Sequence, residues 1–156
     1  MKEDKIMRTI ILFDVDHVIS DAAWRDEMIK RARDSGMWDE YHSRGKEDKP
    51  FEDVVYLINH MARCNTHIEV WAITARPEKY RKQTMDWFTK HGVMLDMLLM
   101  RPEDKFKPAP EIKIDLCKEE GILDRVLCIF DDREDVVSAF RELGITAFQV
   151  FAARRS

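Results

Sequence analysis

Residues 10–16, Ile10-Ile11-Leu12-Phe13-Asp14-Val15-Asp16, decide the fold that this sequence predicts. Four consecutive apolar residues are typical of a buried strand, and two carboxylates follow that strand at once. On an extended chain the i, i+2 spacing of Asp14 and Asp16 points both side chains to the same side. Two like charges at a strand end are unfavourable unless an opposite charge compensates them. The two acids could also have a purely structural role, with one Asp capping a turn and the other exposed to solvent. The rest of the chain argues against this interpretation.

The composition is that of a globular protein, with 45% hydrophobic and 36% charged residues among 156. One domain over residues 1–156 is expected at this length. The net charge of −4 does not predict a broad nucleic-acid surface. Neither a signal-peptide core nor an apolar run of membrane-spanning length occurs, so no membrane association is expected. Cys64, Cys117 and Cys128 lack metal-ligand spacing and are expected to be reduced core thiols of a cytoplasmic protein.

Strand and helix patterns alternate along the chain. Apolar runs predict strands over residues 9–13, 68–73, 95–99, 126–130 and 146–151. Amphipathic spacing predicts helices between them, for example at Val54, Leu57, Ile58 and Met61. Pro77 suits the first turn of a helix that runs to His91. This alternation predicts an α/β protein with a five-stranded parallel sheet, right-handed crossovers and helices on both faces.

Three glycines follow predicted helices, each with an apolar residue after it, and are expected to be left-handed C-caps. They are Gly92, Gly121 and Gly144. Neither a G-x-G-x-x-G nor a G-x-x-x-x-G-K motif occurs, which disfavours a dinucleotide-binding protein and a Walker-type kinase.

Polar residues follow four of the predicted strands, at the edge where a parallel sheet places its site. They are Asp14 and Asp16, then Thr74-Ala75-Arg76-Pro77, then Met100-Arg101, then Asp131-Asp132-Arg133. Four converging carboxylates would repel one another, and oxygen ligands in that number suit Mg²⁺. A hydroxyl with Arg and Lys side chains is what a phosphoryl group needs around it. The pattern therefore predicts phosphoryl-transfer chemistry, in which an Asp can itself be the nucleophile.

These residues, in this order, resemble the haloacid dehalogenase (HAD) phosphatases over nearly the whole chain. The most similar group is the phosphatase half of bacteriophage polynucleotide kinase–phosphatase and its stand-alone relatives. The matching segments are Thr74-Ala75-Arg76, Met100-Arg101-Pro102 with Asp104, Glu111-Ile112-Lys113, Phe130-Asp131-Asp132-Arg133, and Trp38-Asp39-x-Tyr41 with Lys49-Pro50. The resemblance implies a three-layer, Rossmann-like fold with a small helical insert at about residues 22–63.

The resemblance also implies roles for the acidic residues. Asp14 would attack phosphorus and form an aspartyl-phosphate. Asp16 would protonate the leaving oxygen and then deprotonate the hydrolytic water, which requires a pKa near the working pH. The Asp14 side chain, the Asp16 backbone carbonyl and Asp131 or Asp132 would hold Mg²⁺.

Phosphate would be bound by Thr74, Ala75 and a lysine, of which Lys113 fits the family spacing best. Lys105 and Lys107 are nearby alternatives. Arg25, Arg76, Arg101 and Asp104 are the candidate substrate-binding residues.

One position departs from the family, which usually has Gly-Thr after its second Asp. Here His17-Val18 stands at that place. The imidazole is expected at the mouth of the site, where it would narrow the pocket, contact substrate or do neither.

The favoured function is a Mg²⁺-dependent phosphatase that removes a 3′-phosphate from a nucleic-acid end, with no obligate protein partner. A nucleoside monophosphate phosphatase is the alternative. A phospho-accepting receiver and an inactive binding module are weaker alternatives; in receivers the accepting Asp follows the third strand, where this chain has Met100-Arg101. Trp24, Trp38 and Tyr41 are candidates for stacking a base, although such residues more often pack on helix faces.

Overall fold

The computed structural model describes residues 7–64 and 67–150 and confirms the predicted α/β class. A parallel five-stranded sheet has the order β5-β4-β1-β6-β7. The strands are β1 (Ile10–Phe13), β4 (Glu69–Pro77), β5 (Met97–Arg101), β6 (Val126–Asp131) and β7 (Thr146–Gln149). β1 is the central strand, so the chain builds the sheet outward on both sides of it. The switch point, where such sheets place their site, is therefore the carboxyl end of β1.

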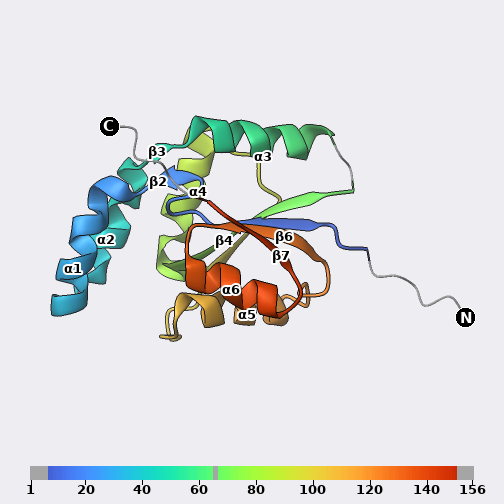
Figure 1. The fold of residues 1–156 in the computed structure, drawn as a ribbon. Coiled ribbons are helices and arrows are strands. Elements are labelled where there is room, and N and C mark those ends of the chain that lie inside the picture. Colours follow the sequence, from blue (N-terminus) through green and yellow to red (C-terminus); the bar gives the residue numbers. More distant parts are fainter. Residues whose placement is uncertain (1–6, 65–66, 151–156) are drawn as a thin grey trace, which may run out of the picture.

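Alternate residues of the strands face opposite sides of the sheet and form two cores. Ile10 and Leu12 face α5 (Ala109–Glu119) and α6 (Glu134–Glu142). Ile11 and Phe13 face α3 (Glu52–Cys64) and α4 (Arg81–Lys90). Figure 1 shows α3 on one face of the sheet and α5 with α6 on the other. Because both faces are covered, β1 is continuously apolar rather than alternating.

The segment between β1 and α3 forms the insert. Its elements are β2 (Ser20–Asp21), η1 (Ala23–Arg25), α1 (Asp26–Ser35), α2 (Trp38–Ser43), η2 (Arg44–Glu47) and β3 (Lys49–Pro50). In Figure 1, α1 and α2 stand away from the sheet, beside its carboxyl edge. The expected insert also included α3, but Val55 and Ile58 bury that helix against the sheet.

Several predicted boundaries differ from the structure by one to four residues. Pro77 ends β4, with φ −63° and ψ 146°, and the helical path begins after it with η3 (Glu78–Tyr80). Because that ψ is extended, proline here precedes the first turn instead of lying inside it. β5 begins two residues later than predicted, and Phe151, expected in the last strand, lies outside the described residues.

The predicted helix caps are confirmed. Gly92, Gly121 and Gly144 all have φ between 64° and 74°, and Gly36 ends α1 with φ 71°. The prediction that all three cysteines are core thiols is wrong, because Cys64 is exposed at the end of α3.

Candidate active site

Three carboxylates meet at the carboxyl edge of the sheet. Asp14 follows β1, and Asp131 and Asp132 lie at the end of the neighbouring β6. One carboxylate oxygen of each lies within 4.8 Å of the others. Burial raises the pKa of Asp14 well above its ordinary value; Lys113 opposes this effect, and Asp131 and Asp132 add to it. Burial and Asp131 also raise the pKa of Asp132.

Lys113 is the buried cation of this carboxylate cluster. It lies in the first half of α5, and its Nζ is 2.5 Å from Asp131 Oδ2 and 3.0 Å from Asp14 Oδ1. Burial lowers the pKa of Lys113, but the two carboxylates outweigh burial and raise it. The alternatives Lys105 and Lys107 instead pair with Glu119 and Asp115 on the outside of α5.

The carboxylate cluster suits a hard divalent cation. Asp14, Asp131 and Asp132 bring three carboxylates against the single ammonium of Lys113, so negative charge remains uncompensated. Carboxylate oxygens at this spacing are the donors that Mg²⁺ takes, together with waters and substrate phosphate. Asp14 and Asp132 line the cavity described below, whereas Asp131 is completely buried. The carboxylate of Asp16 is not part of the cluster.

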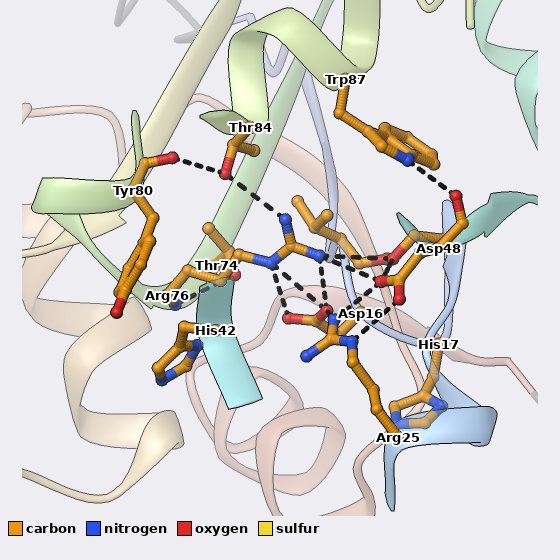
Figure 2. A network of polar contacts seen from close by, with 12 residues as sticks. Asp16, His17, Arg25, His42, Asp48, Thr74, Arg76, Tyr80, Thr84 and Trp87 are labelled. Carbon is orange, nitrogen blue, oxygen red and sulfur yellow. Dashed lines mark hydrogen bonds and ion pairs between the residues drawn. The ribbon is translucent and has the colours of Figure 1, made fainter. Parts of the chain in front are cut away.

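Two arginines surround Asp16. Arg25 Nη2 lies 2.5 Å and Arg76 Nη2 2.7 Å from Asp16 Oδ1, and Arg76 Nε donates to Oδ2 at 3.0 Å. Figure 2 shows both guanidinium groups directed at this carboxylate. Burial raises the pKa of Asp16, but Arg76 and Arg25 outweigh it and hold that pKa well below its ordinary value. In the resting site Asp16 is therefore ionised, so the expected pKa near the working pH is not found here.

A second carboxylate, Asp48, holds the two arginines in place. Its Oδ1 accepts from Arg25 Nε at 2.8 Å and Trp24 Nε1 at 2.9 Å. Its Oδ2 accepts from Arg25 Nη2 at 2.7 Å, Ser20 Oγ at 3.2 Å and Arg76 Nη2 at 3.4 Å (Figure 2). The Asp48 side chain is completely buried. Asp16, Asp48, Arg25 and Arg76 form a buried network with two charges of each sign, which we call the arginine network.

Gly45 on the insert lies directly against the arginine network. A Cβ at this position would be 3.3 Å from the Arg76 guanidinium and 3.4 Å from that of Arg25. A larger residue here would therefore be in tight contact with both guanidinium groups and would displace them by a few tenths of an ångström, which gives this glycine a packing role.

His17 adopts a left-handed backbone, with φ 65°, directly after Asp16. Glycine takes this conformation without strain, which explains why the related phosphatases usually have Gly here. Nε2 of the His17 ring lies 3.1 Å from Asp26 Oδ1, at the start of α1. His17 thus links the loop after β1 to the insert.

A cavity of about 830 Å³ opens between the insert and the carboxyl edge of the sheet. Most of the predicted site residues line it: Asp14, Asp16, Thr74, Ala75, Arg76, Arg101, Lys113 and Asp132. Thr74 Oγ1 accepts from the backbone N–H of Arg76 at 3.1 Å, which fixes the irregular end of β4, where its register with β5 shifts between Thr74 and Pro77. Arg101 donates to the carbonyl of Ala75 at 3.1 Å. Residues from four strand ends thus surround one space.

Two predicted substrate-binding residues do not line this cavity. Arg25 is buried in the arginine network, and Asp104 is exposed in the loop after β5. Of the three aromatic candidates, Trp24 does not line the cavity, whereas Trp38 and the buried Tyr41 do. The guanidinium of Arg44 stacks on Trp24, and that of Arg25 lies 4.3 Å from the ring centre of the buried Tyr41.

The family described as the phosphatase domain of polynucleotide kinase PNKP matches residues 8–154. The chain belongs to this family. It is therefore a HAD-type phosphatase, as the sequence predicted. No curated protein matches the chain.

Solved structures share the fold of this PNKP-type phosphatase domain. A chain of the Pnkp1/Rnl/Hen1 complex is 25% identical with a TM-score of 0.76, over 96% of this chain and 48% of that one. A predicted phosphatase from Clostridium acetobutylicum is 14% identical with a TM-score of 0.68, over 92% of this chain and 84% of that one. A haloacid dehalogenase-like hydrolase from Streptococcus pneumoniae is 12% identical with a TM-score of 0.65, over 92% and 84%. This chain thus spans about half the length of the matching chain of the Pnkp1/Rnl/Hen1 complex.

The sequence did not predict that Asp48 belongs to the site of this PNKP-type phosphatase domain. It lies in the polar run Lys46-Glu47-Asp48-Lys49, where nothing separates a buried acid from solvated ones. Its burial depends on Arg25 and Arg76, which lie 23 and 28 residues away along the chain.

Over residues 7–64 and 67–150, no helix is long and apolar enough to cross a membrane.

Proposed function

We propose that this chain hydrolyses a 3′-phosphate from a nucleic-acid end through an aspartyl-phosphate at Asp14. The observation that carries the proposal is the cavity floor, where Asp14, Lys113 and Thr74 face the same space beside Asp131 and Asp132. A nucleophile, a buried ammonium and a hydroxyl around one space are what transfer of a phosphoryl group requires.

In the first step an oxygen of Asp14 attacks phosphorus, and the bond from phosphorus to the sugar 3′-oxygen breaks. Lys113 and Thr74 bind phosphate oxygens and neutralise charge as it develops. The departing oxygen takes a proton from Asp16 and leaves as a hydroxyl. In the second step Asp16 removes a proton from water, which attacks phosphorus and breaks its bond to Asp14. The products are inorganic phosphate and the restored Asp14 carboxylate.

The second step needs an ionised Asp16, which is the form that Arg76 and Arg25 favour, although the same two contacts make it a weaker base. The first step needs a protonated Asp16, so its pKa must rise when substrate binds. A phosphate group near Arg76 would compete with Asp16 for the guanidinium and weaken the interaction that lowers the pKa. Asp16 would then serve as acid and as base in turn.

Mg²⁺ is part of the proposal. Asp14, one or both of Asp131 and Asp132, and the backbone carbonyl of Asp16 would hold it. When bound, it would compensate the charge of the acids and of the substrate phosphate.

The charge of the cavity wall supports a nucleic-acid end as substrate. Arg33, Arg101 and Arg133 line the cavity beyond its floor. Within the described part of the chain, Arg33 and Arg101 form no ion pair, whereas Arg133 pairs with Asp135. Cations without carboxylate partners are available to the phosphates that precede the terminal nucleotide. A second structure of the Pnkp1/Rnl/Hen1 complex is described as an RNA repair complex, and the likeness of this chain to one of its chains also supports a nucleic-acid end as substrate.

Phosphate release with Mg²⁺ tests the proposal. The substrates are a 3′-phosphorylated oligonucleotide, a 5′-phosphorylated one of the same sequence and the free nucleoside monophosphates, with Asp14→Asn as control. We expect the 3′-phosphorylated oligonucleotide to have the highest kcat/KM. Preference for the free monophosphates would instead establish the nucleotidase, which the size of the cavity also accommodates. Equal activity of Asp14→Asn would refute the mechanism for either substrate.

A further inference from the structure

Phe106 is an exposed aromatic residue at the edge of the cavity. Its side chain is 85% exposed, although Phe106 lies among the residues that line the cavity. Large apolar side chains that stay exposed beside a cavity often mark a contact for a ligand.

The loop that carries Phe106 is attached to the fold on both sides of the ring. Lys105 pairs with Glu119, and Lys107 Nζ lies 2.9 Å from Asp115 Oδ2, both on α5. Arg101 Nη1 also donates to the carbonyl of Lys105 at 3.0 Å. The Phe106 side chain therefore remains exposed to solvent, although the residues before and after it are fixed to α5 by ion pairs.

Arg101 supports the Phe106 ring from one side. Its guanidinium carbon lies 5.4 Å from the ring centre, within the range of a cation–π contact. Nε of Arg101 is occupied by the carbonyl of Ala75, so the guanidinium is oriented from the core of the site. The remainder of the ring is open to a further planar group.

Trp38 is the aromatic residue that the insert contributes to the same cavity. It begins α2, is 38% exposed, and packs edge-on against Tyr41 at 6.1 Å between ring centres. α2 is itself held to the main fold: Tyr80 donates to Asp39 Oδ1 at 2.6 Å, and Gln83 donates to the His42 carbonyl at 3.0 Å. Both aromatic walls of the cavity are therefore fixed relative to its floor.

We infer that Trp38 and Phe106 form a base-stacking site for the 3′-terminal nucleotide, a role that rests on the proposed function. A nucleobase is the planar group of a nucleic-acid end, and stacking on aromatic rings is tolerant of its identity. The phosphate lies at the floor beside Asp14 while the base is held between the insert and the loop after β5. The terminal base therefore contributes to specificity without a hydrogen-bonded readout.

The experiment compares two 3′-phosphorylated oligonucleotides that differ only in the terminal residue, which carries a base in one and is abasic in the other. For the unmodified chain we expect a kcat/KM about tenfold higher with the base, the size of one aromatic stacking contact. Phe106→Ala should lose that preference, so that its kcat/KM becomes equal on the two substrates. Tyr56→Ala, which removes an exposed aromatic residue of α3 outside this cavity, should keep it.

The variants of Trp38 separate stacking from packing, because Trp38→Ala also removes a contact with Tyr41. Trp38→Phe should restore most of the base preference that Trp38→Ala loses. Equal rates of the unmodified chain on the two substrates would overturn the stacking site while leaving the proposed function intact. Phosphate release from neither oligonucleotide would overturn the proposed function, and the stacking site with it.

Discussion

Asp14 and Asp16 lie two residues apart after the same strand, but the charges around them are opposite. Asp14 lies with Asp131 and Asp132 beside Lys113, and its pKa is raised by burial, with a smaller contribution from the two acids and against the effect of Lys113. Asp16 meets Arg25 and Arg76, and its pKa is lowered. The carboxylate cluster thus has an excess of negative charge, whereas the arginine network is neutral in itself. The difference teaches that two carboxylates next to one strand end can have opposite electrostatic surroundings: the carboxylate cluster has charge left to attract a cation, whereas the arginine network balances its own charges.

The largest effect is expected from Asp14→Asn. The amide cannot attack phosphorus, so kcat should fall by at least about a thousandfold. Initial rates of phosphate release with the 3′-phosphorylated oligonucleotide measure it, and the melting temperature checks that the variant folds. A residual rate within tenfold of the unmodified chain would remove Asp14 from the chemistry.

Asp48→Ala tests whether the arginine network needs both of its carboxylates to stabilise the fold. It leaves Arg25 and Arg76 buried without one of their two carboxylates, which typically costs roughly 3–5 kcal/mol of unfolding free energy. Urea unfolding measures this change, with Asp34→Ala on the exposed side of α1 as the matched control. A loss no larger than that of the control would show that Asp16 alone is enough to hold both arginines.

Mg²⁺ should stabilise the protein through the carboxylate cluster. Binding to the folded state alone adds about 2.7 kcal/mol at a hundred times the Kd. The melting temperature in Mg²⁺ should exceed that in EDTA, and Asp132→Asn should reduce the difference. The same increase in Asp132→Asn and in the unmodified chain would place the ion elsewhere.

The two carboxylates should give opposite dependences of stability on pH. The pKa of Asp16 is lowered on folding, so its stabilisation is present above its ordinary pKa of 3.8 and is lost as the pH falls below that value. The pKa of Asp14 is raised, so its favourable contribution is present in acid and is lost as the pH rises through the folded-state pKa.

Urea unfolding in EDTA from about pH 3 to about pH 8 measures both slopes. Asp16→Asn should remove part of the rise in stability with pH, and Asp14→Asn should remove part of the fall. Parallel curves for the two variants would contradict the contrast between their surroundings.

The smallest effect on stability is expected at His17, in the loop that follows Asp14 and Asp16. His17→Gly relieves a left-handed strain of about 1–2 kcal/mol but adds about 0.5–1 kcal/mol of chain entropy in the unfolded state. Both variants also lose the contact between His17 and Asp26. The net change for His17→Gly is therefore expected to be within about 0.5 kcal/mol, while His17→Ala, which keeps the strain, should be the least stable of the three proteins. Thermal unfolding of the three proteins side by side measures the order, and a His17→Gly variant below His17→Ala would contradict it.

The succession of strands along the chain and the edge that carries the site follow from local patterns, whereas the order β5-β4-β1-β6-β7 within the sheet does not. The run at 10–13 has to be a buried strand because four consecutive apolar residues need apolar surroundings on both faces. Parallel strands then bring Asp14, Thr74, Arg101 and Asp132 to one edge without any knowledge of the packing. The sequence could not show that Phe106 stays exposed, because nothing local separates it from a core phenylalanine.

The sequence by itself determined the α/β class, the left-handed caps at Gly92, Gly121 and Gly144, and the group of acids at the strand ends. These features depend on residues that are near one another in the chain, because hydrophobic periodicity predicts strands and helices and the backbone preference of glycine predicts the helix caps. The tertiary structure alone decided that Asp48 and Arg25 lie buried together, that Lys113 rather than Lys105 reaches the acids, and that Asp14 and Asp16 have opposite pKa shifts. Charge and burial depend on which distant groups lie within a few ångströms, and only the packed chain brings those groups together.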